Sequence, residues 1–286
     1  MLSRRVPLLV LVGLALGCTK AAVDSKVPVR ATSLHIACRG EGRPAVVLEA
    51  GLGNDSRVWS AVLPEVARTT QVCAYDRAGM GASNRPAPRP HSNRQMAEEL
   101  RELLRATEVS EPYVLVGHSM GGANARYFAA ESPDAVVGMV LVDAASEQQP
   151  SRYWALLPEA TLAEFKQGLA GMPEGLDFDT FRDGLENLKT VSPSLGKLPL
   201  VVLAHGKPLP NPPGVSAERG EQLETAWRSM QGDLAHLSTN SVYVIVENAG
   251  HHIQLDEPQV VVAAINEVVA SVREQRALER QAISRY

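Results

Sequence analysis

The stretch "YVLVGHSMGGANARYF", residues 113–128, joins an apolar run of β-forming residues to a helical pattern of small residues. Between them, Gly117 to Gly121 match the pattern G-x-S-x-G with Ser119 at its centre. A tight turn on these glycines would expose the serine hydroxyl above the end of a strand and aim a helix N-terminus at developing negative charge. Ser119 is therefore a candidate nucleophile; the alternative is a glycine-rich loop with a serine of no chemical role.

Short apolar runs alternate with helical patterns along most of the chain. Besides 113–117, strands are predicted at 33–38, 45–51, 70–76, 137–143, 199–204 and 242–246. Helices are predicted at 93–106, from Met120 to about Glu131, at 216–235 and from Pro258 onward. Strands that are apolar on both faces and alternate with helices indicate a mostly parallel, doubly wound α/β sheet covered by helices on each side.

The alternation stops between Asp143 and Pro199, where short helical patterns are broken by proline and glycine. We interpret residues 145–197 as a helical lid inserted after the strand that ends at Asp143, with the α/β core formed by 31–144 and 198–286. Four lid aromatics are candidates for an apolar pocket or for packing of the lid on the core: Trp154, Phe165, Phe178 and Phe181.

The first residues are typical of an export signal over 1–17, with Arg4 and Arg5 before an apolar stretch that is too short to span a bilayer. "LALGC" resembles the lipobox of bacterial lipoproteins, which implies that Cys18 is lipidated and becomes the mature N-terminus. Either a membrane-anchored periplasmic lipoprotein or a freely secreted bacterial protein is expected. Residues 18–30 are polar and are predicted to form a tether.

Composition narrows the class of protein further. The chain has 286 residues, 45% of them hydrophobic and 21% charged, which suits one globular domain with a large core. Its formal net charge of -4 gives no reason to expect a nucleic-acid partner. No metal-ligand spacing occurs in the sequence, so neither a metal nor a cofactor is expected.

Five stretches together resemble the α/β-hydrolase family, in the order that the family uses: "VVLEAGLG", "YDRAGMGAS", "VLVGHSMGG", "MVLVDAA" and "AGHHIQLDEP". The resemblance covers nearly all of the chain after the tether. It implies an α/β-hydrolase fold with Ser119 as the nucleophile of an acyl-transfer site.

A serine nucleophile needs a base. By resemblance, the base belongs to the Gly-His pair of "GHHIQLDEP", which favours His251 and leaves His252 as its rival. A loop-capping role for the pair is the alternative. His118 is predicted to support the strand end, and Asp256 and Glu257 to serve the N-terminus of the helix that follows.

The acid that orients the base is harder to find. In many relatives it follows the penultimate strand, but here that strand ends "VVLAHGKPLPNPPG", with no carboxylate until Glu218. The other position that the family allows is the end of the preceding strand, which is Asp143. Glu218 and Glu221 are the fallback, and a helix N-cap or lid anchor is the alternative role for Asp143.

The same resemblance implies an oxyanion hole built from two main-chain N–H groups, those of Met120 and Leu52. Asp76 and Arg77 are expected to shape a turn beside the Leu52 loop rather than to take part in chemistry. The family's strand order also places Cys38 and Cys73 on neighbouring strands, so a Cys38–Cys73 disulfide is predicted; two small buried hydrophobic residues are the alternative.

The function predicted from these features is hydrolysis of carboxylic esters or related acyl compounds, with small-molecule substrates. Ser119 would attack, His251 would move the proton and Asp143 would orient it. A carbon–carbon bond hydrolase, a peptidase and an acyltransferase use the same set of residues and stay open. A binding protein that kept the fold without catalysis is the alternative of another class.

Overall fold

The computed structural model describes residues 23–85 and 90–283. The expected export signal over 1–17 and Cys18 lie outside the described residues. In the described part of the chain, none of the helices combines the length and the apolar character that a membrane crossing requires.

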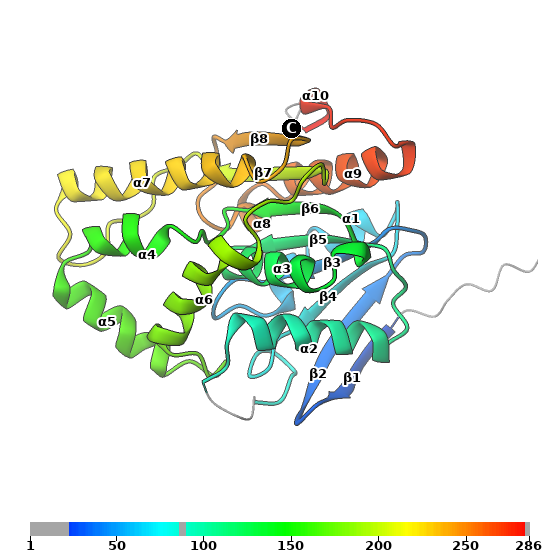
Figure 1. The fold of residues 1–286 in the computed structure, drawn as a ribbon, viewed down its shortest axis with the longest axis horizontal. Coiled ribbons are helices and arrows are strands. Elements are labelled where there is room, and N and C mark those ends of the chain that lie inside the picture. The colour runs from blue at the N-terminus through cyan, green and yellow to red at the C-terminus, as the bar shows by residue number, and fades with distance from the viewer. Residues whose placement is uncertain (1–22, 86–89, 284–286) are drawn as a thin grey trace, which may run out of the picture.

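An eight-stranded sheet of the described residues forms the centre of the molecule (Figure 1). Its strands are β1 (Val23–Val29), β2 (Thr32–Arg39), β3 (Ala45–Glu49), β4 (Val72–Asp76), β5 (Tyr113–His118), β6 (Val136–Val142), β7 (Leu200–His205) and β8 (Ser241–Val246). Their order across the sheet is β1-β2-β4-β3-β5-β6-β7-β8. All neighbours from β4 to β8 are parallel, whereas β2 is antiparallel to both β1 and β4. The predicted mostly parallel sheet is confirmed.

The tether predicted over 18–30 is wrong for residues 23–29, which form β1. This edge strand pairs along its whole length with β2. Val23, Val27 and Val29 share one face and pack against the core, but exposed Ser25 interrupts this period-2 pattern, which weakens the strand signal in the sequence.

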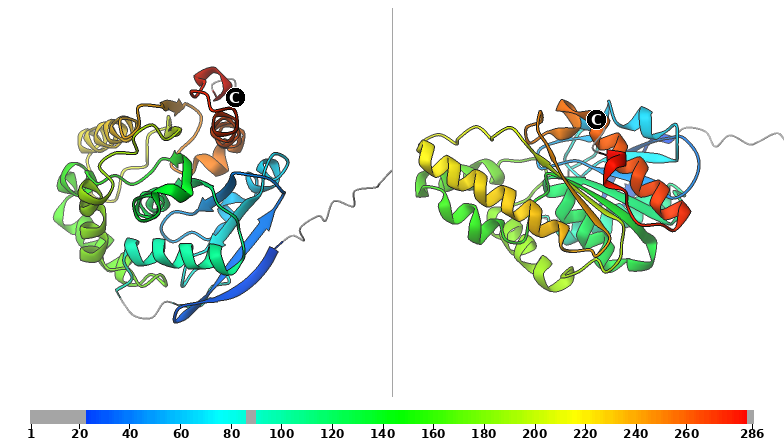
Figure 2. Two further views of the ribbon diagram at one scale, coloured as in Figure 1. Left: turned by 45° about the vertical axis from the view of Figure 1, so that its right-hand side comes forward. Right: turned by 90° about the horizontal axis from the view of Figure 1, so that it is seen from above.

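Helices cover both faces of the sheet (Figure 2). On one face lie α2 (Asn93–Ala106) and α3 (Met120–Glu131), against which α6 (Phe178–Val191) packs, and on the other lie α1 (Leu63–Val66), α9 (Pro258–Glu274) and α10 (Arg280–Ile283). Within β5, Leu115 packs into the first core while Val114 and Val116 pack into the second. Burial on both faces explains the continuous apolar run of this strand.

Helical segments fill the interval between β6 and β7, where the alternation stops. They are α4 (Gln149–Arg152), the 3-10 helix η3 (Trp154–Leu156), α5 (Glu159–Ala170) and α6. Together with α7 (Ala217–Ala235) they extend one side of the molecule (Figure 1). The remaining short helices are η1 (Ser56–Trp59), η2 (Pro133–Ala135) and α8 (Ile253–Asp256).

β2 and β4 place Cys38 directly opposite Cys73. The two Cα atoms lie 4.0 Å apart and the cysteines form a disulfide. The predicted pairing is confirmed, and the bond joins the edge hairpin to the interior of the sheet.

Candidate active site

Ser119 occupies the turn between β5 and α3, with backbone angles φ 50° and ψ -121°. A positive φ is unfavourable for a non-glycine residue, and such strain persists only where the surroundings impose it. Here the Ser119 N–H donates to the carbonyl of Val142, and the Ser119 carbonyl accepts from the N–H of Ala145. The turn is thus bound to the end of β6.

Close packing fixes the same turn from both sides. A Cβ atom on Gly117 would collide with the main chain of Gly121, and one on Gly121 would collide with the carbonyls of Glu49 and Ala50. The glycines predicted to allow a tight turn therefore allow α3 to approach β3 and β5.

Asp143 follows β6, with a φ of 44° and a fully buried side chain. Its Oδ2 lies 2.5 Å from Nδ1 of His251 and 2.8 Å from Nδ1 of His205. Its Oδ1 accepts a hydrogen bond of 2.9 Å from the indole N–H of Trp227. Burial by itself would raise the pKa of the Asp143 carboxyl, but the hydrogen bonds and charges of His205 and His251 outweigh it and hold that pKa well below its usual range.

The two neighbouring histidines of the predicted pair have different partners. His251 contacts Asp143, whereas Nε2 of His252 lies 3.2 Å from the amide oxygen of Asn54. The geometry therefore brings His251, and not His252, to the carboxylate.

His118 supports the loop that carries His251 and His252. Its Nε2 lies 2.9 Å from the main-chain carbonyl of His251, and its ring centroid is 4.7 Å from the His251 ring. Only a protonated Nε2 can donate to a carbonyl, so the proton of the neutral ring is on Nε2. Burial, together with the charges of His251 and His252, holds the pKa of His118 well below its usual value, which keeps the ring neutral.

Asp256 closes the same loop. It was expected at the N-terminus of α9, but its Oδ2 accepts a hydrogen bond of 2.8 Å from the N–H of Gly250. Glu257 is the N-cap residue of α9 without a side-chain hydrogen bond to it. Glu257 thus stands at the N-terminus of α9 as expected, whereas the Asp256 carboxylate is bound to the main chain at Gly250, before His251.

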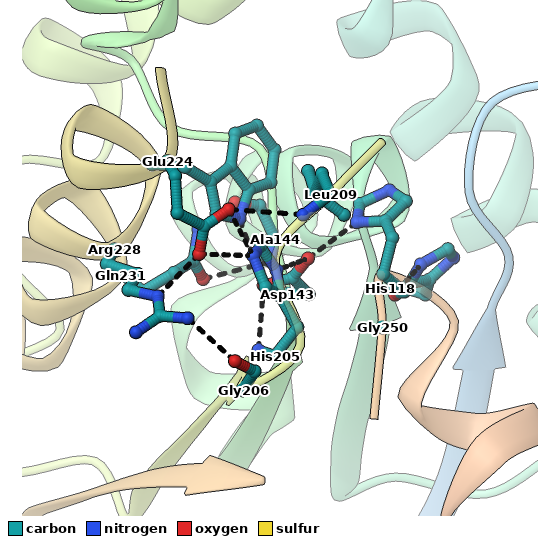
Figure 3. A network of polar contacts seen from close by, with 12 residues as sticks. His118, Asp143, Ala144, His205, Gly206, Leu209, Glu224, Arg228, Gln231 and Gly250 are labelled. Atoms are coloured by element: carbon teal, nitrogen blue, oxygen red, sulfur yellow. Dashed lines mark hydrogen bonds and ion pairs between the residues drawn. The ribbon is translucent and has the colours of Figure 1, made fainter. Parts of the chain in front are cut away.

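Sequence reasoning missed three residues that contact Asp143 or its neighbour: His205, Trp227 and Glu224. His205 ends β7, and its Nε2 lies 3.0 Å from Oε1 of Glu224 on α7 (Figure 3). The predicted fallback acids Glu218 and Glu221 are on the same helix, but they are exposed. A usable signal existed for His205, because polar residues at the carboxyl ends of parallel strands gather at the ligand-binding edge.

A cavity of about 510 Å³ opens above Ser119. Its lining includes Ser119, His251 and Trp227 from the core, and Trp154, Phe165 and Phe181 from the segment between β6 and β7. Phe178 packs against Trp154 with ring centroids 4.9 Å apart. The aromatic residues of this segment thus divide between lining the cavity and packing behind its wall. No Lys, Arg, Asp or Glu occurs among the described residues that line the cavity.

Leu52 and Met120, the two residues predicted to supply oxyanion donors, also line the cavity. The loop that carries Leu52 is held by Arg77, which donates to the carbonyls of Ala50 and Gly51 and pairs with buried Glu174. Glu174 in turn accepts from the N–H of Gly53. The predicted structural role of Arg77 agrees with these contacts.

The ligand-type atoms of Asp143, His205 and His251 all lie within 4.8 Å of one another, the kind of cluster that could hold a metal ion. Both imidazole Nδ1 atoms point at one oxygen of Asp143. Hydrogen bonds account for that arrangement, since a cation would have to separate Oδ2 of Asp143 from the two nitrogens that already contact it.

Comparison with known proteins agrees with this architecture. A family model described as "alpha/beta hydrolase fold" matches residues 44–205. The chain is 30% identical over 248 residues to the uncharacterised protein YqjL of Bacillus subtilis (strain 168), covering 86% of this chain and 91% of YqjL. It is 25% identical over 299 residues to an AB hydrolase superfamily protein of Gibberella zeae, covering 84% of this chain and 92% of that protein.

Among solved structures, a thermophilic esterase from Thermogutta terrifontis superposes with a TM-score of 0.62 at 23% sequence identity, covering 88% of this chain and 99% of the esterase. At that identity the likeness concerns the fold alone. The matched family model and the relative similar over nearly its whole length establish that this chain belongs to the α/β-hydrolase family.

Proposed function

We propose that this protein hydrolyses uncharged carboxylic esters through an acyl-enzyme on Ser119. The single observation that carries the proposal is the contact of 2.5 Å between Asp143 and His251 at a cavity that Ser119 also lines. The apolar, uncharged lining of that cavity favours neutral acyl groups over charged ones.

In the proposed reaction, Nδ1 of His251 donates to Asp143, which leaves Nε2 as the nitrogen that takes the proton of the Ser119 hydroxyl. The serine oxygen bonds to the ester carbonyl carbon, and the resulting oxyanion is stabilised by the N–H groups of Leu52 and Met120. Collapse breaks the bond to the alcohol, which leaves with the proton from His251. Water then attacks the acyl-enzyme by the same proton route and releases the carboxylic acid and free Ser119.

The test is hydrolysis of p-nitrophenyl esters together with covalent labelling by a fluorophosphonate probe. Wild type should turn over and label, whereas Ser119→Ala should do neither, because the bond-forming oxygen is gone. Ser151→Ala is the matched control, since Ser151 is exposed on α4. Wild type that neither turns over nor labels, or Ser119→Ala that labels as wild type does, would favour a non-catalytic binding protein.

Amide substrates and an added alcohol, tested beside the esters, separate the remaining chemistries of this residue set. A peptidase would cleave amide substrates at rates comparable to esters, and an acyltransferase would transfer the acyl group to an added alcohol in preference to water. A carbon–carbon bond hydrolase would label at Ser119 yet turn over esters poorly.

We also propose that the protein is exported in a bacterium and anchored through a lipid on Cys18. The supporting observations are the signal-like residues 1–17 and the lipobox-like "LALGC". Fractionation of cells that express wild type and Cys18→Ser tests this. Wild type should follow the membrane fraction and incorporate a labelled fatty acid, and Cys18→Ser should do neither; a soluble, unlabelled wild type would indicate free secretion.

A further inference from the structure

His205 lies between two carboxylates. Its side chain is fully buried at the end of β7, with Nδ1 2.8 Å from Oδ2 of Asp143 and Nε2 at 3.0 and 3.1 Å from the two carboxylate oxygens of Glu224 (Figure 3). Both distances fall in the range of N–H to oxygen hydrogen bonds.

This geometry restricts the protonation state of the ring. An ionised carboxylate accepts hydrogen bonds and donates none, so each ring nitrogen must carry a proton to bond with its carboxylate. A neutral imidazole has one N–H and would direct a lone pair at the other carboxylate, without solvent to relieve the repulsion. His205 therefore suits the imidazolium form.

The charged side chains around His205 are consistent with its imidazolium form. Asp143 comes from the loop after β6, and Glu224 and Arg228 come from α7, where Arg228 pairs with Glu224 and donates to the Gly206 carbonyl. When His205 is protonated, the charges of His205, Asp143, Glu224 and Arg228 sum to zero.

The other titratable groups around this cluster lie on five further segments. Lys207 is exposed on the loop after β7. Tyr153 and Tyr243 come from the segment before η3 and from β8, and burial raises the pKa of both phenols, which keeps them neutral. His118, His251 and His252, with Asp256 beside the last, occupy the base side of Asp143.

We propose that His205 is a positioning residue: a buried imidazolium that fixes the Asp143 carboxylate between two histidines and offsets part of its negative charge. The inference rests on the proposed function, in which His251 is the base. The positive charge of His205 opposes a second positive charge on the other side of Asp143, so it bears directly on the proton transfer proposed for His251. In many relatives the acid that orients the base follows the penultimate strand. Here the end of that strand, β7, carries His205, which contacts the proposed acid Asp143 instead.

Electrostatics agree with the hydrogen-bond geometry. Burial alone would lower the pKa of the His205 imidazole, but the hydrogen bonds and negative charges of Asp143 and Glu224 outweigh it and raise the pKa above its usual value.

The direct test is NMR of ¹⁵N-histidine-labelled full-length protein between pH 5 and 9, with His205 assigned from the signals missing in His205→Asn. We expect two N–H signals from the His205 ring at pH 8, at which a free imidazole is neutral. A single ring proton on His205 at pH 7 and above would overturn the proposal. This readout requires no activity, so it stands even if the proposed ester hydrolysis fails.

Glu224→Gln supplies a second variant that retains the buried histidine. It removes one of the two negative charges on the ring, so His205 should lose its second proton at lower pH than in wild type. Glu221→Gln, an equal change at an exposed position of α7, should leave the His205 titration unchanged. Equal titrations in Glu224→Gln and wild type would contradict the inference.

Kinetics then separate a positioning role from a merely structural one. In His205→Asn the acidic limb of the kcat/KM profile for ester hydrolysis should move to higher pH by roughly one to three units, the effect of removing one nearby charge. His236→Asn, outside the cluster, should not move it. The His251 ring signals should titrate at higher pH in the same variant, which provides the readout if turnover is absent. An unmoved limb, or unmoved His251 signals, in a folded His205→Asn would refute the role.

Discussion

At the scale of single residues, two backbone positions shape this site. Ser119 and Asp143 have positive φ angles of 50° and 44°, although neither is glycine. They are joined through β6, since the Ser119 N–H donates to Val142, the residue before Asp143. One strand end therefore positions both the proposed nucleophile turn and the proposed acid.

Asp143→Asn tests the acid at this scale. We expect kcat for ester hydrolysis to fall by about four orders of magnitude, because an amide cannot stabilise the imidazolium and favours the wrong tautomer of His251. Steady-state kinetics alongside a thermal melt give the measurement, with exposed Asp134→Asn on η2 as the control. Near-normal turnover in a folded Asp143→Asn would move the acid role to another carboxylate.

Glu49, at the end of β3, gives a second residue-level prediction. Burial raises the pKa of this carboxyl from 4.5 to about 7, although Arg77 opposes the shift. The native state therefore keeps the proton while the unfolded chain releases it, so stability falls as pH rises from about 4.5 to above 7, by up to about 3 kcal/mol.

Glu49→Gln should abolish that loss, because glutamine has no proton to release and its oxygen can still accept from Asn124. Urea denaturation should show a variant more stable than wild type at pH 8 and similar to it at pH 4.5. Exposed Glu159→Gln serves as the control, and an equal difference at both pH values would count against the mechanism.

At the scale of elements, the disulfide joins an exposed edge hairpin to the buried sheet. β1 contributes little burial of its own, so β2 and the Cys38–Cys73 bond to β4 anchor the edge. An edge strand held only by main-chain pairing would be prone to fraying.

Removing the bond in Cys38→Ala/Cys73→Ala should lower the free energy of unfolding by about 2–4 kcal/mol, the typical contribution of a disulfide that closes a loop of this order. The measurement is urea unfolding of wild type with and without reductant, beside the double variant. Reductant should destabilise wild type alone; a double variant as stable as oxidised wild type would show that the bond is dispensable.

At the scale of the whole molecule, the cavity is formed jointly by two parts of the chain. Core residues form part of its lining, and the segment between β6 and β7 supplies aromatic side chains. Specificity for the acyl group is therefore expected to depend on that inserted segment, far in sequence from Ser119.

Phe165→Ala tests this division. Phe165 lines the cavity, so its truncation should enlarge the cavity and shift the preferred p-nitrophenyl ester to a longer acyl chain. Phe178→Ala removes an equal ring from the same aromatic cluster behind the wall, and should lower stability without shifting the preference. Identical chain-length profiles in wild type and Phe165→Ala would exclude the proposed acyl pocket.

The sequence by itself determined the sheet, its helices, the disulfide and the Ser119 turn. Each depends on local patterns: continuous apolar runs for strands buried on both faces, glycines around the turn, and ordered motifs that resemble one family. β1 was missed because Ser25 interrupts the row formed by Val23, Val27 and Val29, so only a fragment of the alternating pattern is present.

Only the tertiary structure decided which groups besides His251 meet at Asp143. His205 and Trp227 lie 62 and 84 residues from it in sequence, and no local pattern encodes a contact across that separation. The choice of His251 over His252 depends on a loop held by His118 and Asp256. The place of Glu224 depends on how α7 packs beside β7. Side-chain packing between distant segments, rather than propensity or periodicity, therefore fixed the electrostatics of the site.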